Sequence, residues 1–294
     1  MAIGGAKGGV GKTIVAVNLA LALTQTNLCS CVANDKQGAI RVVIIDADYE
    51  NANTHILLGI SKIEKSIENY FNQEIDLNSL VIETKYKNLR LICGGNNKIE
   101  LAPAKKKRFL EEIKKIPADF VVIDLAAGMA DGMIDLFNLA DEKIMVVTPQ
   151  YTSLQNAYGF IKEAFLQKLK SVPEMVVCLR HVDNDPFRLI SALKKLSDDH
   201  PLKRRFDLSI SEQRFWILAN MVQEEKDLSV INGLVKLTKE FFNIDASTLG
   251  KIHFSQEIFA SVNKTIPFIA FDNQSENSKQ LRKIAFILSE YSKS

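Results

Sequence analysis

Short continuous runs of apolar residues recur along the chain, and each is followed by a segment with helical spacing. Val, Ile and Leu dominate these runs, and polar residues do not alternate with them. Continuous apolar runs of this length are typical of parallel strands that are buried on both faces of a sheet. The predicted strands cover residues 41–46, 89–93, 120–124, 143–148 and 215–220.

The segments between these runs carry apolar residues on one side of a predicted helix. Ile14, Val17 and Leu21 are three and four residues apart, and the same spacing recurs before residues 120–124. An alternation of strands and helices predicts an α/β fold, with a doubly wound, mostly parallel sheet and helices on both faces.

Ligands bind to such sheets at the carboxyl ends of the strands. Four polar residues each end one of the predicted runs, namely Asp46, Asp124, Thr148 and Asn220. We therefore expect the functional site at this end of the sheet.

Two segments interrupt the alternation of strands and helices. We expect an extended polar loop at about residues 24–37 and a mainly helical surface insertion at about residues 168–213. Within the insertion, residues 175–179 (MVVCL) compete with residues 215–220 for the place of the late strand. No repeat or linker marks a second unit, so we predict a single domain over residues 1–294.

The bulk composition excludes several classes of protein. Apolar residues make up 47% and charged residues 24% of the 294 positions, which is typical of a soluble globular chain. The formal charge of +2 gives no general attraction to nucleic acid, so DNA binding would need a local basic patch. Neither a signal peptide nor a long apolar stretch is present, and we expect a cytoplasmic protein.

The cysteines carry no pattern of a metal or redox site. They stand at positions 29, 31, 93 and 178, without a CxxC pair. We expect reduced thiols rather than ligands of zinc or of an iron–sulfur cluster.

The chemistry concentrates in a glycine-rich loop near the start of the chain. Residues 5–13 (GAKGGVGKT) match the pattern GxxxxGK[ST] and lie between an apolar start and a helical segment, as a phosphate-binding loop does. Glycines let backbone N–H groups turn inward around phosphate oxygens, Lys12 would contact the β- and γ-phosphates, and Thr13 would supply a hydroxyl to Mg²⁺. The predicted cofactors are ATP and Mg²⁺, with ATP bound by Gly8, Gly9, Val10, Gly11, Lys12, Thr13 and Ile14.

The loop also contains a second lysine, Lys7, and in this it resembles the deviant Walker A ATPases of the MinD/ParA family. The resemblance continues through residues 46–60, 119–128 and 140–162. The runs NANTHILLGI and TPQYTSLQNAY are most similar to the FlhG-type branch of that family.

The resemblance implies roles for the charged residues. Lys7 would reach the partner's nucleotide across a dimer interface. Asp46 and Asp124 would each hold Mg²⁺ through water, and Asp48 would position the attacking water. A plain turn or helix-capping role remains an alternative for Asp48. With Lys12, Lys7 and Asp48 form the predicted catalytic set.

The resemblance also implies that two later residues lie beside the adenine base. By the resemblance, Asn220 would hydrogen-bond adenine at the end of the late strand. Pro267 would either pack beside the base or serve as a turn proline.

The function implied is that of a slow, Mg²⁺-dependent ATPase that acts as an ATP-bridged homodimeric switch. It would position flagella or division machinery and bind an unidentified regulatory or cargo protein. Alternatives are a DNA-partition ATPase of ParA type, with a basic surface at residues 105–108 and 203–205, a metabolic ATP-dependent enzyme of the same fold, and a regulator with negligible turnover.

The ends of the chain bear on partners. Many flagellar FlhG proteins carry a segment before the loop that activates a GTPase partner. This chain begins six residues before Lys7, so we do not expect it to have that GTPase partner. Residues 278–294 have the apolar spacing of a helix packed on the sheet, which we favour over a membrane anchor. Transient membrane contact at the periphery stays open.

Overall fold

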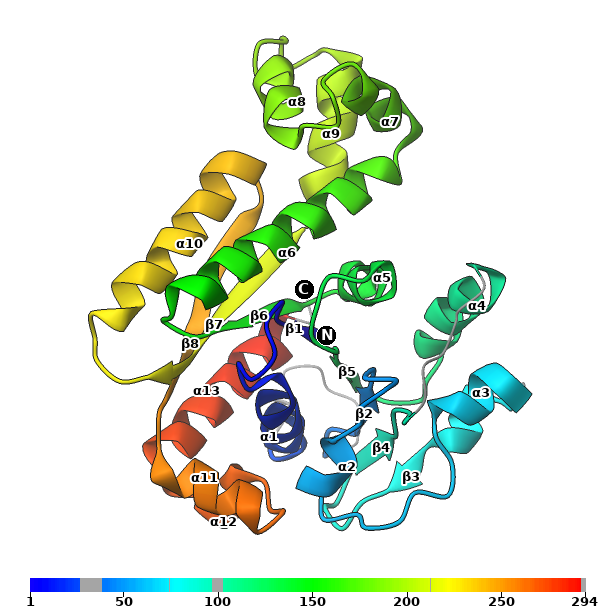
Figure 1. Ribbon diagram of the computed structural model, residues 1–294, viewed down its shortest axis with the longest axis vertical. Coiled ribbons are helices and arrows are strands. Elements are labelled where there is room, and N and C mark those ends of the chain that lie inside the picture. The colour runs from blue at the N-terminus through cyan, green and yellow to red at the C-terminus, as the bar shows by residue number, and fades with distance from the viewer. Residues whose placement is uncertain (27–38, 74, 97–102, 212, 292–294) are drawn as a thin grey trace, which may run out of the picture.

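A mostly parallel sheet with β1 near its centre organises the structure (Figure 1). The computed structural model describes residues 1–26, 39–73, 75–96, 103–211 and 213–291. Over these residues the sheet has eight strands in the order β3-β4-β2-β5-β1-β6-β7-β8, and only β3 and β4 pair antiparallel. The strands are β1 (Ala2–Gly4), β2 (Val42–Asp46), β3 (Ile82–Glu83), β4 (Leu89–Ile92), β5 (Phe120–Asp124), β6 (Lys143–Val147), β7 (Arg214–Val222) and β8 (Asp245–His253).

The register of the central strands brings their carboxyl ends together. Asp46, the last residue of β2, pairs with Asp124, the last residue of β5, and Asp124 also pairs with Ile3 of β1. Because β1 leads directly into the glycine-rich loop, this register places two carboxylates beside it. The predicted α/β fold and the five predicted strands are confirmed.

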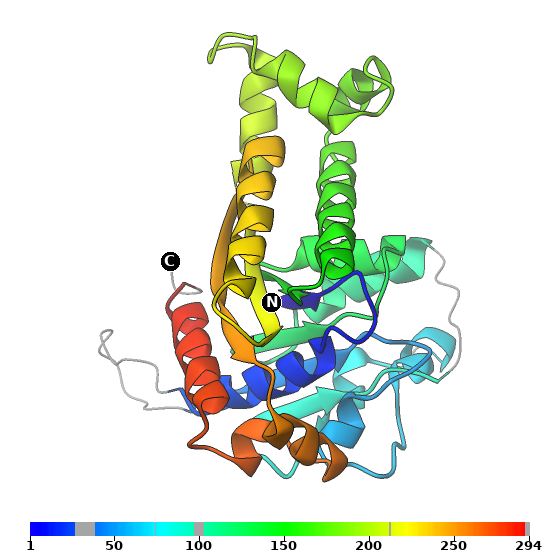
Figure 2. The same ribbon diagram turned by 60° about the vertical axis from the view of Figure 1, so that its left-hand side comes forward.

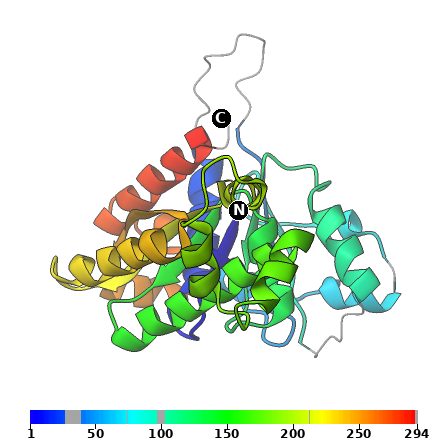
Figure 3. The ribbon, with the colours of Figure 1, turned by 90° about the horizontal axis from the view of Figure 1, so that it is seen from above.

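Helices cover both faces of the sheet (Figure 3). One apolar core joins the sheet to α1, α12 and α13, and the other joins it to α3, α4, α5, α6 and α10. The helices are α1 (Lys12–Thr24), α2 (Thr54–Leu57), α3 (Ile67–Gln73), α4 (Pro103–Ile113), α5 (Asp131–Leu139), α6 (Tyr151–Lys170), α7 (Pro173–Arg180), α8 (Pro186–Leu193), α9 (Pro201–Ser211), α10 (Asp227–Phe242), α11 (Gln256–Asn263), α12 (Phe268–Phe271) and α13 (Glu276–Tyr291), with a 3₁₀ turn η1 (Leu77–Leu80).

The helix after the loop, α1, is buried on nearly all sides. Every residue from position 15 to position 23 is buried, and α13 packs against it. A helix that is apolar all round belongs in the interior, where it cannot shift without disturbing the core. The loop in front of α1 therefore starts from a fixed point. The predicted loop at residues 24–37 begins too early, because Thr24 is the last residue of α1, and residues 27–37 of it lie outside the described residues.

Three short helices, α7, α8 and α9, follow α6 and stand at its far end from the loop (Figures 1 and 2). Each begins with a proline, which suits the first turn of a helix because its missing N–H has no intrahelical partner there. The competing strand at residues 175–179 was wrong. Met175 and Leu179 are both buried within α7, since a spacing of four residues places them on one helical face.

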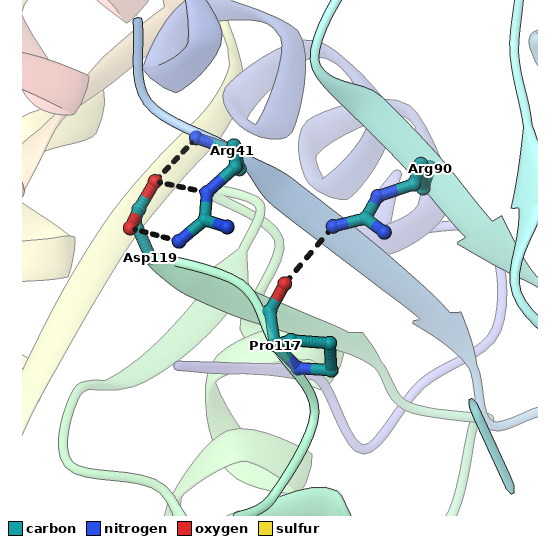
Figure 4. Close-up of polar contacts among 4 residues, drawn as sticks. All are labelled: Arg41, Arg90, Pro117 and Asp119. Atoms are coloured by element: carbon teal, nitrogen blue, oxygen red, sulfur yellow. Dashed lines mark hydrogen bonds and ion pairs between the residues drawn. The ribbon is translucent and has the colours of Figure 1, made fainter. Parts of the chain in front are cut away.

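An ion pair ties the opposite, amino ends of β2 and β5 (Figure 4). The backbone N–H and Nε of Arg41 donate to Oδ2 of Asp119 at 2.7 and 3.2 Å, and Nη2 donates to Oδ1 at 3.0 Å. Arg90 donates from Nη2 to the carbonyl oxygen of Pro117 at 3.0 Å. The Arg41 guanidinium lowers the pKa of Asp119. The pair is largely exposed, so it specifies register more than it adds stability.

The C-terminal helix α13 is part of the core. Leu281, Ile284, Ala285 and Leu288 are fully buried against α1 and β8. This confirms the predicted packing of that helix on the body of the protein. Among the helices that the structure describes, none combines the length and the apolar composition that a membrane span requires.

The burial of α13 gives a test of this packing. Leu281→Ala removes a fully buried side chain and should lower the free energy of unfolding by about 2–5 kcal/mol. Phe286 lies on the same helix but is 50% exposed, so Phe286→Ala is the matched control and should cost much less. Urea unfolding of both variants measures the difference. Equal losses would contradict the packing described here.

Candidate functional site

The loop between β1 and α1 has the backbone of an anion cradle. Gly9 and Gly11 have φ of +79° and +91°, values that favour glycine. Among the described residues, no side chain caps the start of α1, and none of their atoms lies within 4 Å of the position that a Cβ would take at Gly8 or Gly9. The first N–H groups of the helix are therefore left for a ligand, and the helix dipole favours an anion there.

Lys12 lies inside this cradle. Its side chain is only 8% exposed, and its Nζ donates to the carbonyl oxygen of Lys7 at 3.4 Å. Burial lowers the pKa of the Lys12 ammonium, while the nearby carboxylates of Asp124 and Asp48 oppose that shift. A buried cation with one long hydrogen bond suits the role of a phosphate contact.

Asp46 is held by backbone N–H groups at the end of β2. Its Oδ1 accepts from Asp48 N–H at 3.0 Å, and its Oδ2 accepts from the N–H groups of Asn53 and Thr54 at 3.1 and 3.0 Å. The side chain is 1% exposed, and burial raises its pKa above the ordinary value although these hydrogen bonds oppose the shift. The carboxylate is thus fixed in orientation before any ligand binds.

Asp124 is the least satisfied group of the site. Its Oδ2 accepts from the Thr54 hydroxyl at 3.2 Å, but its buried Oδ1 has no hydrogen-bond partner among the described residues. Burial raises the pKa of Asp124, Asp46 raises it further, and Thr13 and Lys12 act in the opposite direction. A buried carboxylate oxygen without a partner is costly unless a cation or ordered water satisfies it.

These oxygens fit Mg²⁺. The carboxylates of Asp46 and Asp124 and the hydroxyl of Thr13 are the hard ligands that this ion prefers, and Mg²⁺ usually keeps several waters. In the part of the chain that the structure describes, no group of three or more His, Cys, Asp or Glu side chains is placed to hold a metal ion by itself. The remaining positions around the ion would fall to water and phosphate.

Asp48 closes a tight turn just beyond β2. Its Oδ1 accepts from the N–H groups of Glu50 and Asn51 at 3.2 and 2.8 Å. Oδ1 of Asp48 therefore stabilises the turn, as the alternative role predicts. The same two hydrogen bonds fix the direction of the Asp48 carboxylate. Both roles are compatible with this geometry.

Lys7 reaches the start of α6. Its Nζ donates to Thr152 Oγ1 at 3.1 Å and to Gln150 Oε1 at 3.4 Å. The two lysines of the loop therefore lie differently, since Lys12 is buried in the cradle and Lys7 contacts α6 at the surface.

Asn220 lies inside β7, not at its end, which corrects the predicted boundary. The strand continues to Val222, because register shifts and the left-handed Met221 (φ +57°) let it follow β8 further. Nδ2 of Asn220 donates to the carbonyl oxygen of Val10 at 2.8 Å, and a Cβ at Gly11 would lie 2.3 Å from this nitrogen. Asn220 is thus packed directly on the glycine-rich loop.

An apolar pocket opens next to Asn220. The first turn of α1 lines one side, and the end of β8 with α11 lines the other, including the partly exposed rings of Phe254 and Phe259. Pro267 directly precedes α12, whose Phe268 also lines the pocket.

Strand β8 and the contacts of Thr54 with the two aspartates were not predicted from the sequence. Residues 245–253 (DASTLGKIH) mix polar residues and glycine with few apolar ones, so they lack the continuous apolar run used to find the other strands. Thr54 stands six residues after Asp48, and its spacing gave no signal that it would contact both Asp46 and Asp124.

The fold and the site define a nucleotide-binding α/β protein of the P-loop class. A ParA family model, described as NUBPL iron-transfer P-loop NTPase, matches residues 1–176, which is more than half of the chain. The chain belongs to the MinD/ParA family of deviant Walker A P-loop ATPases. Iron transfer belongs to the description of the family model, and no cysteine follows Asp124 until Cys178.

Individual relatives agree with this membership. The chain is 25% identical over 270 residues to the antiactivator FleN of Pseudomonas aeruginosa, covering 90% of this chain and 76% of FleN. It is 30% identical over 155 residues to a putative septum site-determining protein MinD of Oltmannsiellopsis viridis, covering 51% of this chain and 45% of that protein. The structure of MinD complexed with Mg-ADP from Pyrococcus horikoshii OT3 shares the fold, with a TM-score of 0.63, 17% identity and coverage of 99% and 96% of the two chains.

The buried carboxylate of Asp124 predicts a pH-dependent stability. Its pKa is raised on folding, so the folded state binds its proton more tightly than the unfolded state. Stability of the nucleotide-free protein should therefore fall as the pH rises from the ordinary carboxyl pKa of about 4 towards neutrality. Asp124→Asn removes the buried charge and should raise Tm near pH 8 by about 2–4 °C, equivalent to about 1 kcal/mol for a domain of this size.

Thermal unfolding between about pH 5 and pH 8 measures this effect. A carboxyl group with a raised pKa titrates over about this range. The exposed Asp207 provides a control, because Asp207→Asn should leave the pH profile of Tm unchanged. Parallel profiles for wild type and Asp124→Asn would contradict the assignment of the stability loss to Asp124.

Proposed function

We propose that this protein is an ATP- and Mg²⁺-dependent switch that dimerises around ATP, hydrolyses it slowly and positions a cellular structure. The observation that carries the proposal is the division between the two lysines of one loop. Lys12 is buried in the phosphate cradle, whereas Lys7 extends to the surface at the start of α6. A loop lysine that is not committed to its own cradle is available to a second subunit.

The residues of the cradle divide the work on ATP. Backbone N–H groups of residues 8–14 hold the phosphates, and the Lys12 ammonium contacts the β- and γ-phosphates. Thr13 would hold Mg²⁺ through its hydroxyl, and Asp46 and Asp124 would hold it through water. The ion would supply positive charge that offsets the charge developing during phosphoryl transfer.

Asp48 orients the attacking water. Its carboxylate is held by the turn that it closes, so its direction is set before ATP binds. Positioning of this kind supplies most of the catalysis that a protein can give to phosphoryl transfer.

The apolar pocket beside the loop accommodates the base. Asn220 uses one N–H on Val10, which anchors the amide, and its remaining groups recognise adenine. The apolar walls from α1, β8 and α11 cover the faces of the ring.

The dimer forms over the face that carries the loop, where each Lys7 reaches the partner's nucleotide. Large apolar side chains are exposed around that face, including Tyr151 at 79% and Met129 at 47%. Tyr151 stands between Gln150 and Thr152, which Lys7 contacts. ATP shifts the population to the dimer because it binds that state more tightly, and hydrolysis returns the monomer.

The cargo is inferred from the relatives. FleN is named as an antiactivator and MinD as a septum site-determining protein, so we propose that the dimer binds a regulatory protein and positions flagella or the division site. Transient membrane contact would accompany such a role.

A DNA-partition role has less support. Five of the seven basic side chains in the two runs considered for it, residues 105–108 and 203–205, form ion pairs, which reduces the net field of the runs. The pairs are Lys106–Asp135, Arg108–Glu112, Lys203–Asp198, Arg204–Asp199 and Arg205–Glu174.

Three single variants separate the steps of the switch. Lys12→Ala should abolish ATP binding, because it removes the buried cation of the cradle. Lys7→Ala should bind ATP and stay monomeric, since its cradle is intact and its bridge is lost. Asp48→Ala should bind ATP and remain dimeric, because hydrolysis no longer releases the partner. Size-exclusion chromatography with ATP and Mg²⁺, together with phosphate release, measures all three.

Two controls frame this experiment. Lys62→Ala removes an exposed lysine whose ion pair in the described structure is with the equally exposed Glu64, and it should behave as wild type. Wild type with ADP should be monomeric. A monomeric Asp48→Ala in ATP, or a dimeric Lys7→Ala, would refute the switch.

A further inference from the structure

Two glycines after β4, Gly94 and Gly95, lie against the turn that carries Asp48 without room for a side chain. A Cβ at Gly94 would lie 2.4 Å from the carbonyl oxygen of Asp48 and 2.9 Å from that of Asp46. A Cβ at Gly95 would lie 2.6 Å from the carbonyl oxygen of Tyr49. All three contacts are with backbone oxygens, which cannot swing aside as the end of a flexible side chain can.

The need for glycine here comes from space and not from backbone conformation. Among the described residues, the glycines with φ in the left-handed region are Gly9, Gly11, Gly59 and Gly128. Gly94 and Gly95 are not among them, so a left-handed φ is not what requires glycine at these two positions. What excludes a larger residue is the close approach of the turn at residues 46–49.

Hydrogen bonds run in both directions between this glycine pair and the turn. Gly95 N–H donates to the carbonyl oxygen of Asp48 at 3.2 Å, and Ala52 N–H donates to the carbonyl oxygen of Gly95 at 3.3 Å. Asn96 N–H donates to Oε1 of Glu68 at the start of α3, which holds the segment from its other side. The turn from Asp48 to Ala52 is thus clamped at both ends by one short segment.

This clamp controls the direction of the Asp48 carboxylate. Oδ1 of Asp48 accepts hydrogen bonds from the N–H groups of Glu50 and Asn51, and both residues belong to the clamped turn. If a Cβ pushes the carbonyl oxygen of Asp48 or Tyr49 outward, the adjoining peptides rotate and the carboxylate turns with them. A misplacement of about 1 Å in a catalytic group can cost about 100-fold in rate.

We propose that Gly94 and Gly95 are positioning residues for Asp48, which set the rate of hydrolysis and leave ATP binding unchanged. The inference rests on the proposed function, in which Asp48 orients the attacking water. None of the three atoms nearest to a Cβ at Gly94 or at Gly95 belongs to the phosphate loop, so the cradle is separate from the clamp.

The test compares two glycine-to-alanine variants. Gly95→Ala should lower kcat about 10- to 100-fold, keep the Kd for ATP within about threefold of wild type and prolong the life of the ATP-bound dimer. Gly233→Ala is the matched control, because no atom of the described structure lies within 4 Å of a Cβ at that position in α10, and it should keep the wild-type kcat.

Two further variants separate positioning from a general loss of structure. The double variant Gly95→Ala/Asp48→Ala should hydrolyse ATP no more slowly than Asp48→Ala alone, because the clamp acts through Asp48. Glu68→Ala adds no atom and removes the acceptor of Asn96 N–H, so it should lower kcat to a smaller extent with the Kd unchanged.

The outcomes distinguish the two claims. A wild-type kcat in Gly95→Ala, or a rise in its Kd that matches the fall in turnover, overturns the positioning role and leaves the proposed function standing. If Gly95→Ala does not fold, a wild-type kcat in Glu68→Ala overturns the positioning role. A wild-type protein that binds ATP and releases no phosphate overturns both claims.

Discussion

The burial of two carboxylates side by side, Asp46 and Asp124, is the constraint on which the rest of the site depends. The pairing of β2 with β5 puts them in register, and both are almost inaccessible to solvent. Asp46 is satisfied by three backbone N–H groups, but one oxygen of Asp124 has no partner in the described structure. Such a pair is unfavourable without a cation, which is the physical basis for the proposed Mg²⁺ site.

The surrounding elements hold this pair against the phosphate loop. Thr54 contacts both carboxylates, and the helix that follows the loop is locked in the core. The opposite ends of β2 and β5 are joined by Arg41 and Asp119, which keeps the same register along both strands. Rigid supports of this kind leave the chemistry to small groups at one edge of the sheet.

Much of the fold could be predicted from the sequence because its central strands are continuous apolar runs. Strand β8 could not, since its residues mix polar and apolar positions and are recognised only by their pairing with β7. The alternative strand at residues 175–179 was wrong, and these residues form part of α7. Helical and strand patterns cannot be told apart in so short an apolar run. Asn220 was predicted to end its strand, whereas β7 continues to Val222. No sequence pattern signals the register shift after Ala219.

The candidate site could also be predicted only in part from the sequence. The phosphate loop was visible in the sequence because its glycines and lysines have a fixed spacing, and Asp46 and Asp124 were visible because each ends an apolar run. Their individual roles stay predictions. The tight contacts of Gly94 and Gly95 were not visible, because they depend on which backbone lies across from β4. Contacts across strands are a property of the folded sheet alone.

The most direct test of the central claim, that Lys7 serves the partner's nucleotide, mixes two inactive variants. Lys7→Ala and Asp48→Ala subunits are combined before ATP is added, and phosphate release is followed. If Lys7 acts across the dimer, each mixed dimer contains one site with its own Asp48 and the partner's Lys7, so hydrolysis returns. If the mixture stays as inactive as its components, Lys7 does not act in trans and the account of an ATP-bridged switch is wrong.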